Sequence, residues 1–274
     1  MSLLTPPFEE GRLNRAPVFP IGGVANPVVQ AGIHVTVRTG TVDAYVKLLK
    51  PKAFVAESVS AWLALRVELP IPTPFWVTVH RRLVANVLQW PFGSKETHLC
   101  FGSAAVENAL ALRLAGRTDG ALGRYGLDNV LLGKIALFDE LIGNDDRHDG
   151  NLLVTFDRSV FLIDHERALG GTGLGLFSSD PPLAPNRLLE RVRLLPASER
   201  MSLVKPLREF CATCERAVWT VPYETLVEDV AMRAMVQDYL QRRAEKLRDT
   251  LEDMLGIGDL LSGLPQSSRP SPLL

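Results

Sequence analysis

Cysteine is scarce in this sequence, with three residues in 274. So few cysteines argue against a disulfide framework and favour a reducing, cytoplasmic environment. Long apolar runs are also missing: no stretch approaches the roughly 18 residues needed to cross a bilayer, so no transmembrane segment is expected. The residues from Met1 to Pro7 lack the basic segment and long apolar core of a secretory signal, so secretion is not predicted.

An excess of either charge is absent as well. The formal net charge is -1, which gives no general electrostatic attraction to nucleic acid or anionic membranes, and no nucleic-acid partner is predicted. Hydrophobic residues make up 46% and charged residues 22% of the chain, as in ordinary globular proteins. A chain of 274 residues is long enough for one large domain or two small lobes.

The first part of the chain has the alternation typical of strands. Residues 28–49 alternate apolar and polar side chains on both sides of a turn candidate, which predicts a hairpin. A helix is predicted for residues 52–68, which are bounded by prolines. Residues 75–79 and 99–102 are predicted to form two further short strands.

The second part is predicted to be mainly helical. In residues 127–142 apolar side chains recur every three or four positions, and Asp128 is the N-cap candidate. Residues 104–116 and 186–255 are also predicted to be helical, and residues 152–163 to form a small hairpin. Strands with one helix, followed by helices with one hairpin, indicate an α+β fold in two lobes.

This order gives three predicted regions. Residues 1–103 form a small β-rich N-lobe, and residues 104–255 form a larger helical C-lobe that carries the hairpin. Residues 256–274 are rich in Gly, Ser and Pro and are predicted to be a flexible tail.

The loop from Gly143 to Asn151 concentrates polar residues between an apolar helix and an apolar strand. Asp146 and Asn151 are five residues apart, the spacing of the aspartate and asparagine in the catalytic loop of protein kinases. A carboxylate there can accept or orient the proton of an attacking hydroxyl, and a neutral amide oxygen can hold Mg²⁺. Asp164 follows thirteen residues after Asn151, just past an apolar strand, where a carboxylate can bridge Mg²⁺ to nucleotide phosphates. Taken singly, each aspartate is better explained as a cap in a polar loop, but the joint spacing favours a phosphoryl-transfer site.

Two charged residues in the first part of the chain fit the same chemistry. Lys47 interrupts an apolar strand, where a cation is costly unless it meets phosphate oxygens or a carboxylate. Glu57 lies among alanines at helical spacing, on a face that permits close approach to a sheet. We predict an ion pair between Lys47 and Glu57 that holds the lysine for phosphate binding, as in protein kinases. The alternative is an edge-strand lysine and a solvated glutamate.

Two weaker signals also concern nucleotide binding. Gly22 and Gly23 precede the first strand of the hairpin and are candidates for a cofactor-binding loop, because glycines let backbone N–H groups approach phosphates. An ordinary turn explains them equally well. The segment 99–102 could join the two lobes and contact adenine, on the basis of its place in the chain order alone.

The segment Asn144 to Asn151 resembles the catalytic loop of the HipA-like kinases and is similar to the Asp-Arg-His-x-x-Asn element of phosphatidylinositol kinases. Residues 44–48 resemble the strand that carries the nucleotide-contacting lysine of that group. Residues 56–72 resemble its Asn-Glu helix and Leu-Pro-x-Pro turn, although Ala56 stands where Asn is usual. The resemblance covers roughly residues 20–170.

This resemblance implies a two-lobed protein-kinase-like fold with ATP and Mg²⁺ as cofactors. It implies that Asp146 is the catalytic residue, that Lys47 binds the nucleotide phosphates, and that Asn151 and Asp164 hold the metal. The first hypothesis is therefore a serine/threonine kinase with a protein acceptor. The second hypothesis keeps the phosphoryl transfer, but its acceptor is a hydroxyl of a small molecule or of a lipid headgroup. The third is a non-catalytic nucleotide-binding module, which the presence of all the expected polar residues disfavours.

Three other features have simpler interpretations. Cys211 and Cys214 form a C-x-x-C pair on a predicted helix, but zinc would need two further ligands and none lies nearby, so helix-packed cysteines are favoured. His148 and His165 flank the candidate site, and either could act as a base. Because Asp146 already fills that role, His148 is predicted to fix the loop through hydrogen bonds.

Overall fold

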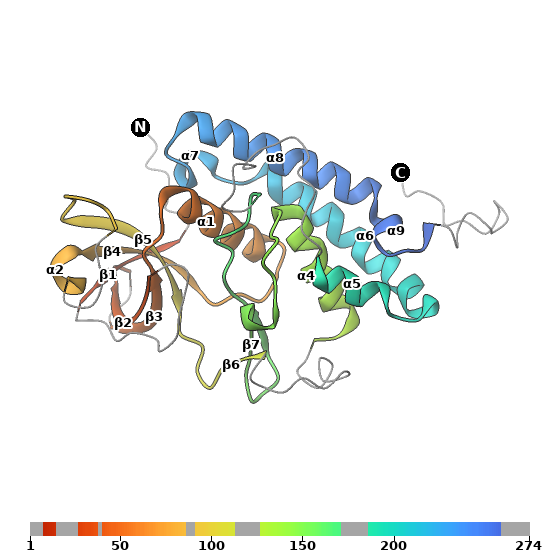
Figure 1. The fold of residues 1–274 in the computed structure, drawn as a ribbon, viewed down its shortest axis with the longest axis horizontal. Helices are drawn as coiled ribbons and strands as arrows, with labels where there is room; N and C mark the ends of the chain where they lie inside the picture. Colours follow the sequence, from red (N-terminus) through yellow and green to blue (C-terminus); the bar gives the residue numbers. More distant parts are fainter. Residues whose placement is uncertain are drawn as a thin grey trace.

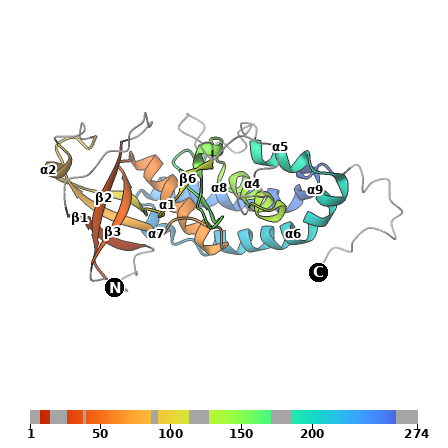
Figure 2. The same cartoon turned by 90° about the horizontal axis from the view of Figure 1, so that it is seen from below.

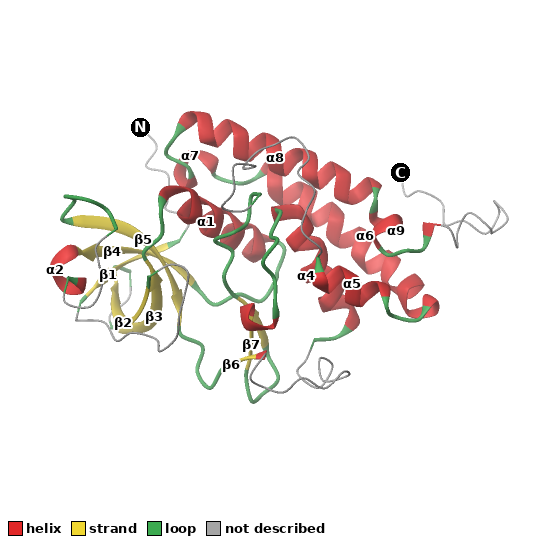
Figure 3. Cartoon of the chain, in the orientation of Figure 1, coloured by secondary structure: helices red, strands yellow, loops and turns green. Residues whose placement is uncertain are grey.

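The computed structural model describes residues 8–14, 27–37, 40–85, 91–112, 127–170 and 186–258. Strands β1 to β5 gather at one end of an elongated molecule, and the long helices α4, α6 and α8 extend toward the other end (Figures 1, 2 and 3). The order along the chain is that of a mixed α+β fold, with a β-barrel first and helices later.

Five strands close into a barrel in the order β1-β2-β3-β5-β4. Strands β1 and β4 pair in parallel, and the other neighbours pair antiparallel. The bounds of the strands are β1 Glu9–Leu13, β2 Val28–Val35, β3 Thr41–Lys47, β4 Pro74–His80 and β5 Thr97–Ala104. The predicted hairpin and the two short strands are therefore present, whereas β1 was not predicted.

Alternation along the strands decides which side chains fill the barrel. Val29 and Ile33 of β2 and Ala44 and Val46 of β3 are fully buried in it, as expected for a strand with one face on a core. Gly102 of β5 lies opposite Val46 in the ladder, and a Cβ atom there would lie 2.7 Å from Cγ2 of Val77. The barrel interior therefore has no room for a side chain at this position.

The helical part contains both long helices and single turns. Helix α4 contacts α5, α6 and α8, and Figure 2 shows it between α5 and α6. The bounds of the helices are α1 Pro51–Arg66, α2 Arg81–Val84, α4 Asn129–Ile142, α5 Arg187–Arg193, α6 Ala197–Trp219, α7 Tyr223–Leu226, α8 Val230–Asp249 and α9 Leu251–Met254. None of the helices in the described ranges is long and apolar enough to cross a membrane.

A second, smaller sheet lies beside the helices in the order β6-β7-β8. It consists of β6 Leu110–Ala111, β7 Leu152–Val154 and β8 Val160–Leu162, and β7 and β8 are the predicted hairpin. The prediction of a helix over residues 104–116 is wrong for its described part, because residue 104 ends β5 and Leu110–Ala111 pairs with β7. Residues 113–116 lie outside the described residues.

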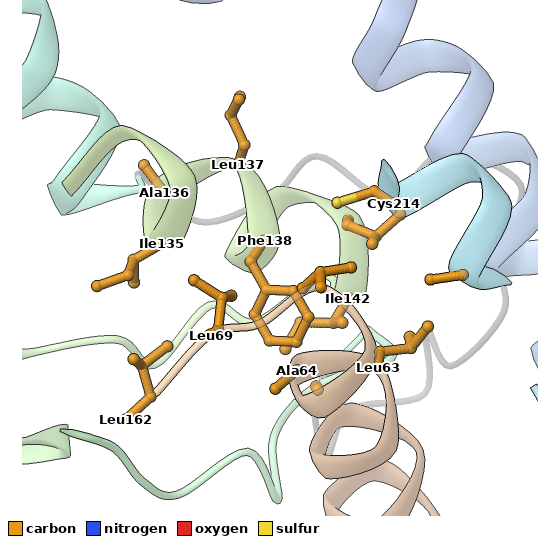
Figure 4. Close-up of a cluster of buried hydrophobic side chains, with 14 of the residues drawn as sticks. Leu63, Ala64, Leu69, Ile135, Ala136, Leu137, Phe138, Ile142, Leu162 and Cys214 are labelled. Carbon is orange, nitrogen blue, oxygen red and sulfur yellow. The ribbon is translucent and has the colours of Figure 1, made fainter. Parts of the chain in front are cut away.

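The largest core joins α1, α4, α6 and the hairpin. Phe138 of α4 is fully buried and lies among Leu63 of α1, Leu69 and Leu162 (Figure 4). Helix α1 thus packs in the core of the later helices, although it lies between two barrel strands in the sequence. This shared core fixes α1, and with it Glu57, relative to the loop that follows α4.

The ends of α4 set the start of that loop. The side chain of Asp128 accepts a hydrogen bond from the backbone N–H of Leu131, so the predicted N-cap is confirmed. Gly143 ends the helix in the left-handed conformation, with φ 61°. A Cβ atom at Gly143 would clash with the hydroxyl of Tyr239 on α8. Glycine is therefore required here both by the backbone and by the neighbouring helix.

Candidate active site

Lys47 is the last residue of β3, and its side chain lies on the face opposite the barrel interior, since the neighbouring Val46 points inward. Its Nζ lies 3.0 Å from Oε2 of Glu57 on α1, so the predicted ion pair is confirmed. The same Nζ lies 2.8 Å from Oδ1 of Asp164, which is 117 residues away in the sequence. The strand, the helix and the loop after β8 thus bring their charged groups to one point.

Burial and charge act in opposite directions on the ion pair. Burial alone would raise the pKa of Glu57, but the attraction of Lys47 and the hydrogen bonds from His165 and Lys47 outweigh it and lower the pKa from 4.5 to about 2. Burial likewise tends to lower the pKa of Lys47, yet Glu57, Asp164 and Glu166 together raise it above its ordinary value. Both groups are therefore charged at neutral pH.

The backbone around Asp164 is held on both sides. The N–H of Leu162 on β8 donates to the carbonyl of Pro70 at 2.8 Å, and the N–H of His165 donates to Oε2 of Glu57 at 2.9 Å. Asp164 has φ 65°, in the left-handed region that a non-glycine residue adopts at a cost. These contacts support the unusual backbone and direct the carboxylate of Asp164 toward Lys47.

A buried ion pair anchors the loop after α4. Asp139 on α4 and Arg147 in the loop are both almost completely buried, and Nη2 of Arg147 lies 3.0 Å from Oδ1 of Asp139. Nη1 of Arg147 also donates to the carbonyls of Asn151 at 3.1 Å and Ile163 at 2.8 Å. One guanidinium therefore joins the helix, the loop and the end of β8. This anchor was not predicted from the sequence.

Two asparagines fix the position of Asp146. Oδ1 of Asn144 accepts from the backbone N–H of Asp146 at 3.2 Å, and Nδ2 of Asn151 donates to the carbonyl of Asp146 at 2.9 Å. The predicted role of His148 in fixing the loop is confirmed, because its Nδ1 accepts from the N–H of Gly150 at 2.9 Å. His165 is buried and packs edge-on against Phe138.

The carboxylate of Asp146 remains partly exposed, with 35% of its side-chain surface accessible. Nη1 of Arg167 lies 3.1 Å from its Oδ1, and the same guanidinium lies 3.3 Å from Oδ1 of Asp145. Arg167 was not singled out from the sequence. Its position three residues after Asp164, a predicted site residue, was the available signal in the sequence.

A cavity of about 250 Å³ lies between the barrel and the β7–β8 hairpin. Apolar side chains form most of its wall, among them Val28, Ile71, Phe101 and Leu162. Lys47, Glu57 and Asp164 form its polar end. Segment 99–102, a candidate for the connection between two lobes, lies within strand β5, and Phe101 contributes to the cavity from there.

The carboxylates around Lys47 provide the donor set of a hard divalent cation. Carboxylate oxygens of Glu57, Asp164 and Glu166 lie within 4.8 Å of one another. Three carboxylates facing the single ammonium of Lys47 leave two negative charges. Nδ2 of Asn151 is used within the loop, and no donor among the described residues bonds its Oδ1. Oxygen donors with this net charge fit Mg²⁺.

Two further pairs of residues were considered in the sequence, a glycine pair and a cysteine pair, and the structure describes only the cysteines. Gly22 and Gly23 lie outside the described residues, so their predicted role stays a prediction. Cys211 and Cys214 are buried and free on α6. Burial raises the pKa of the Cys211 thiol to about 12. They are structural packing residues, as predicted.

Comparison with known proteins agrees with this geometry. A structure of the Helicobacter pylori proinflammatory kinase CtkA superposes with a TM-score of 0.53 at 9% identity and covers 92% of this chain and 98% of that chain. At this identity the likeness concerns the fold. No curated protein sequence is significantly similar to the chain. The family model of the HipA-like kinases matches residues 45–173, which include every charged residue of the site described above. The resemblance to the HipA-like kinases that the loop motif indicates is thus confirmed over residues 45–173.

Proposed function

We propose that the protein is an ATP- and Mg²⁺-dependent kinase that phosphorylates a serine or threonine hydroxyl of a protein acceptor. In this proposal the barrel and the helical part act as the two lobes of a kinase, and the cavity between them holds the nucleotide. The observation that carries the proposal is the meeting of Lys47, Glu57 and Asp164, with distances of 3.0 and 2.8 Å between charged atoms from three separate elements.

The cavity suits a nucleotide because it is apolar at one end and charged at the other. Val28, Phe101 and Leu162 provide flat or branched apolar surface for a base. Lys47 stands at the charged end, where its ammonium can contact phosphate oxygens. Glu57 orients that ammonium and is itself fixed by the N–H of His165. The lysine thus reaches the phosphates from a position set by two other elements.

Asn151 and Asp164 are the proposed Mg²⁺ ligands. The backbone N–H of Ile163 donates to the carbonyl of Asn151 at 3.1 Å, which holds the two ligand-bearing segments side by side. Bound Mg²⁺ would neutralise charge on the phosphates during transfer. Glu166, whose Oε2 lies 3.9 Å from Lys47, adds negative charge to the same end of the cavity.

Asp146 is the proposed catalytic residue. Its backbone is fixed by Asn144 and Asn151, and its partly exposed carboxylate is available to an acceptor hydroxyl. The hydroxyl oxygen would attack the γ-phosphorus, the bond to the bridging oxygen of ADP would break, and the hydroxyl proton would pass to Asp146. Arg167 holds one oxygen of the carboxylate and leaves the other for the acceptor.

A phosphotransfer assay with radiolabelled Mg-ATP and a cell lysate tests the proposal. Label in protein would support it, whereas label confined to lipid or small molecules would move the acceptor to the second hypothesis. Asp146→Ala should lower turnover by about 10²–10⁴ while leaving ATP affinity unchanged. Asp145→Ala is the matched control, since Asp145 contacts the same arginine. Equal turnover in the Asp146→Ala variant and the wild type would contradict the assignment, and no transfer by the wild type would favour a non-catalytic module.

A further inference from the structure

A second pocket, of about 340 Å³, lies between the loop that carries Asp146 and helix α5. The loop contributes Arg147, His148, Asp149 and Gly150 to its wall, and α5 contributes Arg187, Leu188 and Arg191. Arg147 and His148 hold the loop, but none of the lining residues is among the proposed nucleotide-binding, metal-binding or catalytic groups. The pocket therefore needs an explanation of its own.

The wall of this pocket carries positive charge that the described residues do not balance. Nη2 of Arg191 lies 3.3 Å from Oδ1 of Asp149, but Nη1 of Arg191 is buried and has no hydrogen-bond acceptor in the described part of the chain. Arg187 lies one helical turn before Arg191, on the same face of α5, and is exposed. Within the same ranges no carboxylate pairs with Arg187. Because Arg187 is exposed and 39% of the Arg191 side-chain surface is accessible, both guanidinium groups can be reached by an anion in the pocket.

His148 adds a further donor. Its Nδ1 accepts a hydrogen bond from the N–H of Gly150 at 2.9 Å. In a neutral imidazole the other ring nitrogen must then carry the proton. Nε2 of His148 is consequently a hydrogen-bond donor. The pocket combines this donor with two guanidinium groups, whose planar forks match carboxylate and phosphate oxygens.

We propose that this pocket binds an acidic side chain of the acceptor protein, either a carboxylate or a phosphoserine, and so selects acidic acceptor segments. The inference rests on the proposed function, because it names the substrate class of that site. It also predicts where the acidic residue lies. The Cα atom of His148 can be no more than roughly 7.6 Å from that of Asp146, two residues earlier. An extended peptide advances about 3.3 Å per residue, which places the acidic side chain about two to four positions from the phosphorylated hydroxyl.

The first experiment measures specificity. Peptides with one serine and one aspartate, moved stepwise along an otherwise neutral sequence, are phosphorylated with Mg-ATP. The wild type should show a kcat/KM about tenfold higher for aspartate at a preferred offset than for the neutral peptide. Phosphoserine at that offset should be preferred further. Arg187→Glu should abolish or invert the ratio, whereas Arg242→Glu, an exposed change on α8, should preserve it.

The second experiment measures binding without nucleotide. Fluorescence anisotropy of a labelled acidic peptide and of its neutral counterpart should show tighter binding of the acidic one, weakened about tenfold in Arg187→Glu and reduced at high salt. If no peptide is phosphorylated but this difference in binding persists, the result supports the assignment of the pocket and contradicts the proposed kinase activity. If peptides are phosphorylated without an acidic preference, and Arg187→Glu behaves as the wild type, the pocket assignment is wrong and the kinase proposal survives. If acidic and neutral peptides bind equally, the inference is overturned as well.

Discussion

The buried pair of Asp139 and Arg147 offers a sharp test of how the candidate site is held in place. Removing one partner of a buried ion pair leaves an uncompensated charge and typically costs about 3–5 kcal/mol. An unfolding entropy of about 2.1 cal/mol/K per residue gives about 0.6 kcal/mol/K for 274 residues. Asp139→Asn should therefore lower Tm by roughly 5–9 °C when the chain unfolds as one unit.

Arg147→Met should cost more than Asp139→Asn. It leaves the buried Asp139 carboxylate without its cation and removes a donor from the carbonyls of Asn151 and Ile163. The carbonyl of Asn151 keeps the N–H of Ile163 as a donor, whereas the carbonyl of Ile163 loses its donor, which adds about 1–3 kcal/mol. The double variant Asp139→Leu with Arg147→Met should recover much of the ion-pair loss, because apolar replacement of both buried charges is often neutral. It should not recover activity, since the loop and the end of β8 still lack their shared anchor.

Urea unfolding gives the free energies, and Mg-nucleotide affinity with phosphotransfer gives the functional readout. Arg242→Ala, which removes an exposed ion pair on α8, is the control and should change stability by less than about 1 kcal/mol. A double variant with both wild-type stability and wild-type turnover would refute the positioning role of Arg147. Single variants within about 1 kcal/mol of the wild type would show that the pair contributes little to stability.

Three further expectations follow from the site and the barrel. Asp164→Ala should weaken binding of Mg²⁺ with a non-hydrolysable ATP analogue in a folded protein, as measured by calorimetric titration; unchanged affinity would remove Asp164 from the metal site. The pKa of Glu57 falls from 4.5 to about 2 in the folded protein, so its stabilisation of roughly 3 kcal/mol is present above pH 4.5 and lost as the pH falls toward 2. Acid unfolding curves should show this loss in the wild type and lack it in Lys47→Met. Gly102→Ala should destabilise the barrel by about 1–3 kcal/mol in urea, because the new methyl would press on Val77; an unchanged midpoint would mean that the strands move apart easily.

Local sequence patterns were sufficient to predict contacts between residues that are close together in the sequence. The cap at Asp128 depends on a residue three positions away, and the strand–helix order placed Lys47 and Glu57 within reach of each other. The spacing of Asp146 and Asn151 also identified a real contact, because Nδ2 of Asn151 bonds the carbonyl of Asp146. In each case the interacting residues are ten or fewer positions apart.

Features that depend on distant pairing were missed or wrongly predicted. Strand β1 has the polar sequence Glu-Glu-Gly-Arg-Leu and is a strand because it pairs with β2 and β4. The segment around Leu110–Ala111 has helix-forming residues, yet pairing with β7 makes it a strand. Tertiary contacts override local preference in both cases. Asp139 did carry a usable signal, since a carboxylate on an otherwise buried helical face needs a partner.

Lys47, Asp164 and Asp146 each lie at or shortly after the end of an element, and residues without a proposed chemical role fix that end. Lys47 ends β3, where pairing with Val28 and Phe101 holds its backbone. Asp164 follows β8, whose Leu162 is bonded to Pro70. The loop of Asp146 begins at Gly143, whose conformation ends α4. Because backbone pairing and glycine geometry set these three points, changes at the anchors should disturb phosphoryl transfer as much as changes at the charged groups themselves. The site therefore extends, in physical terms, well beyond the residues that would touch ATP.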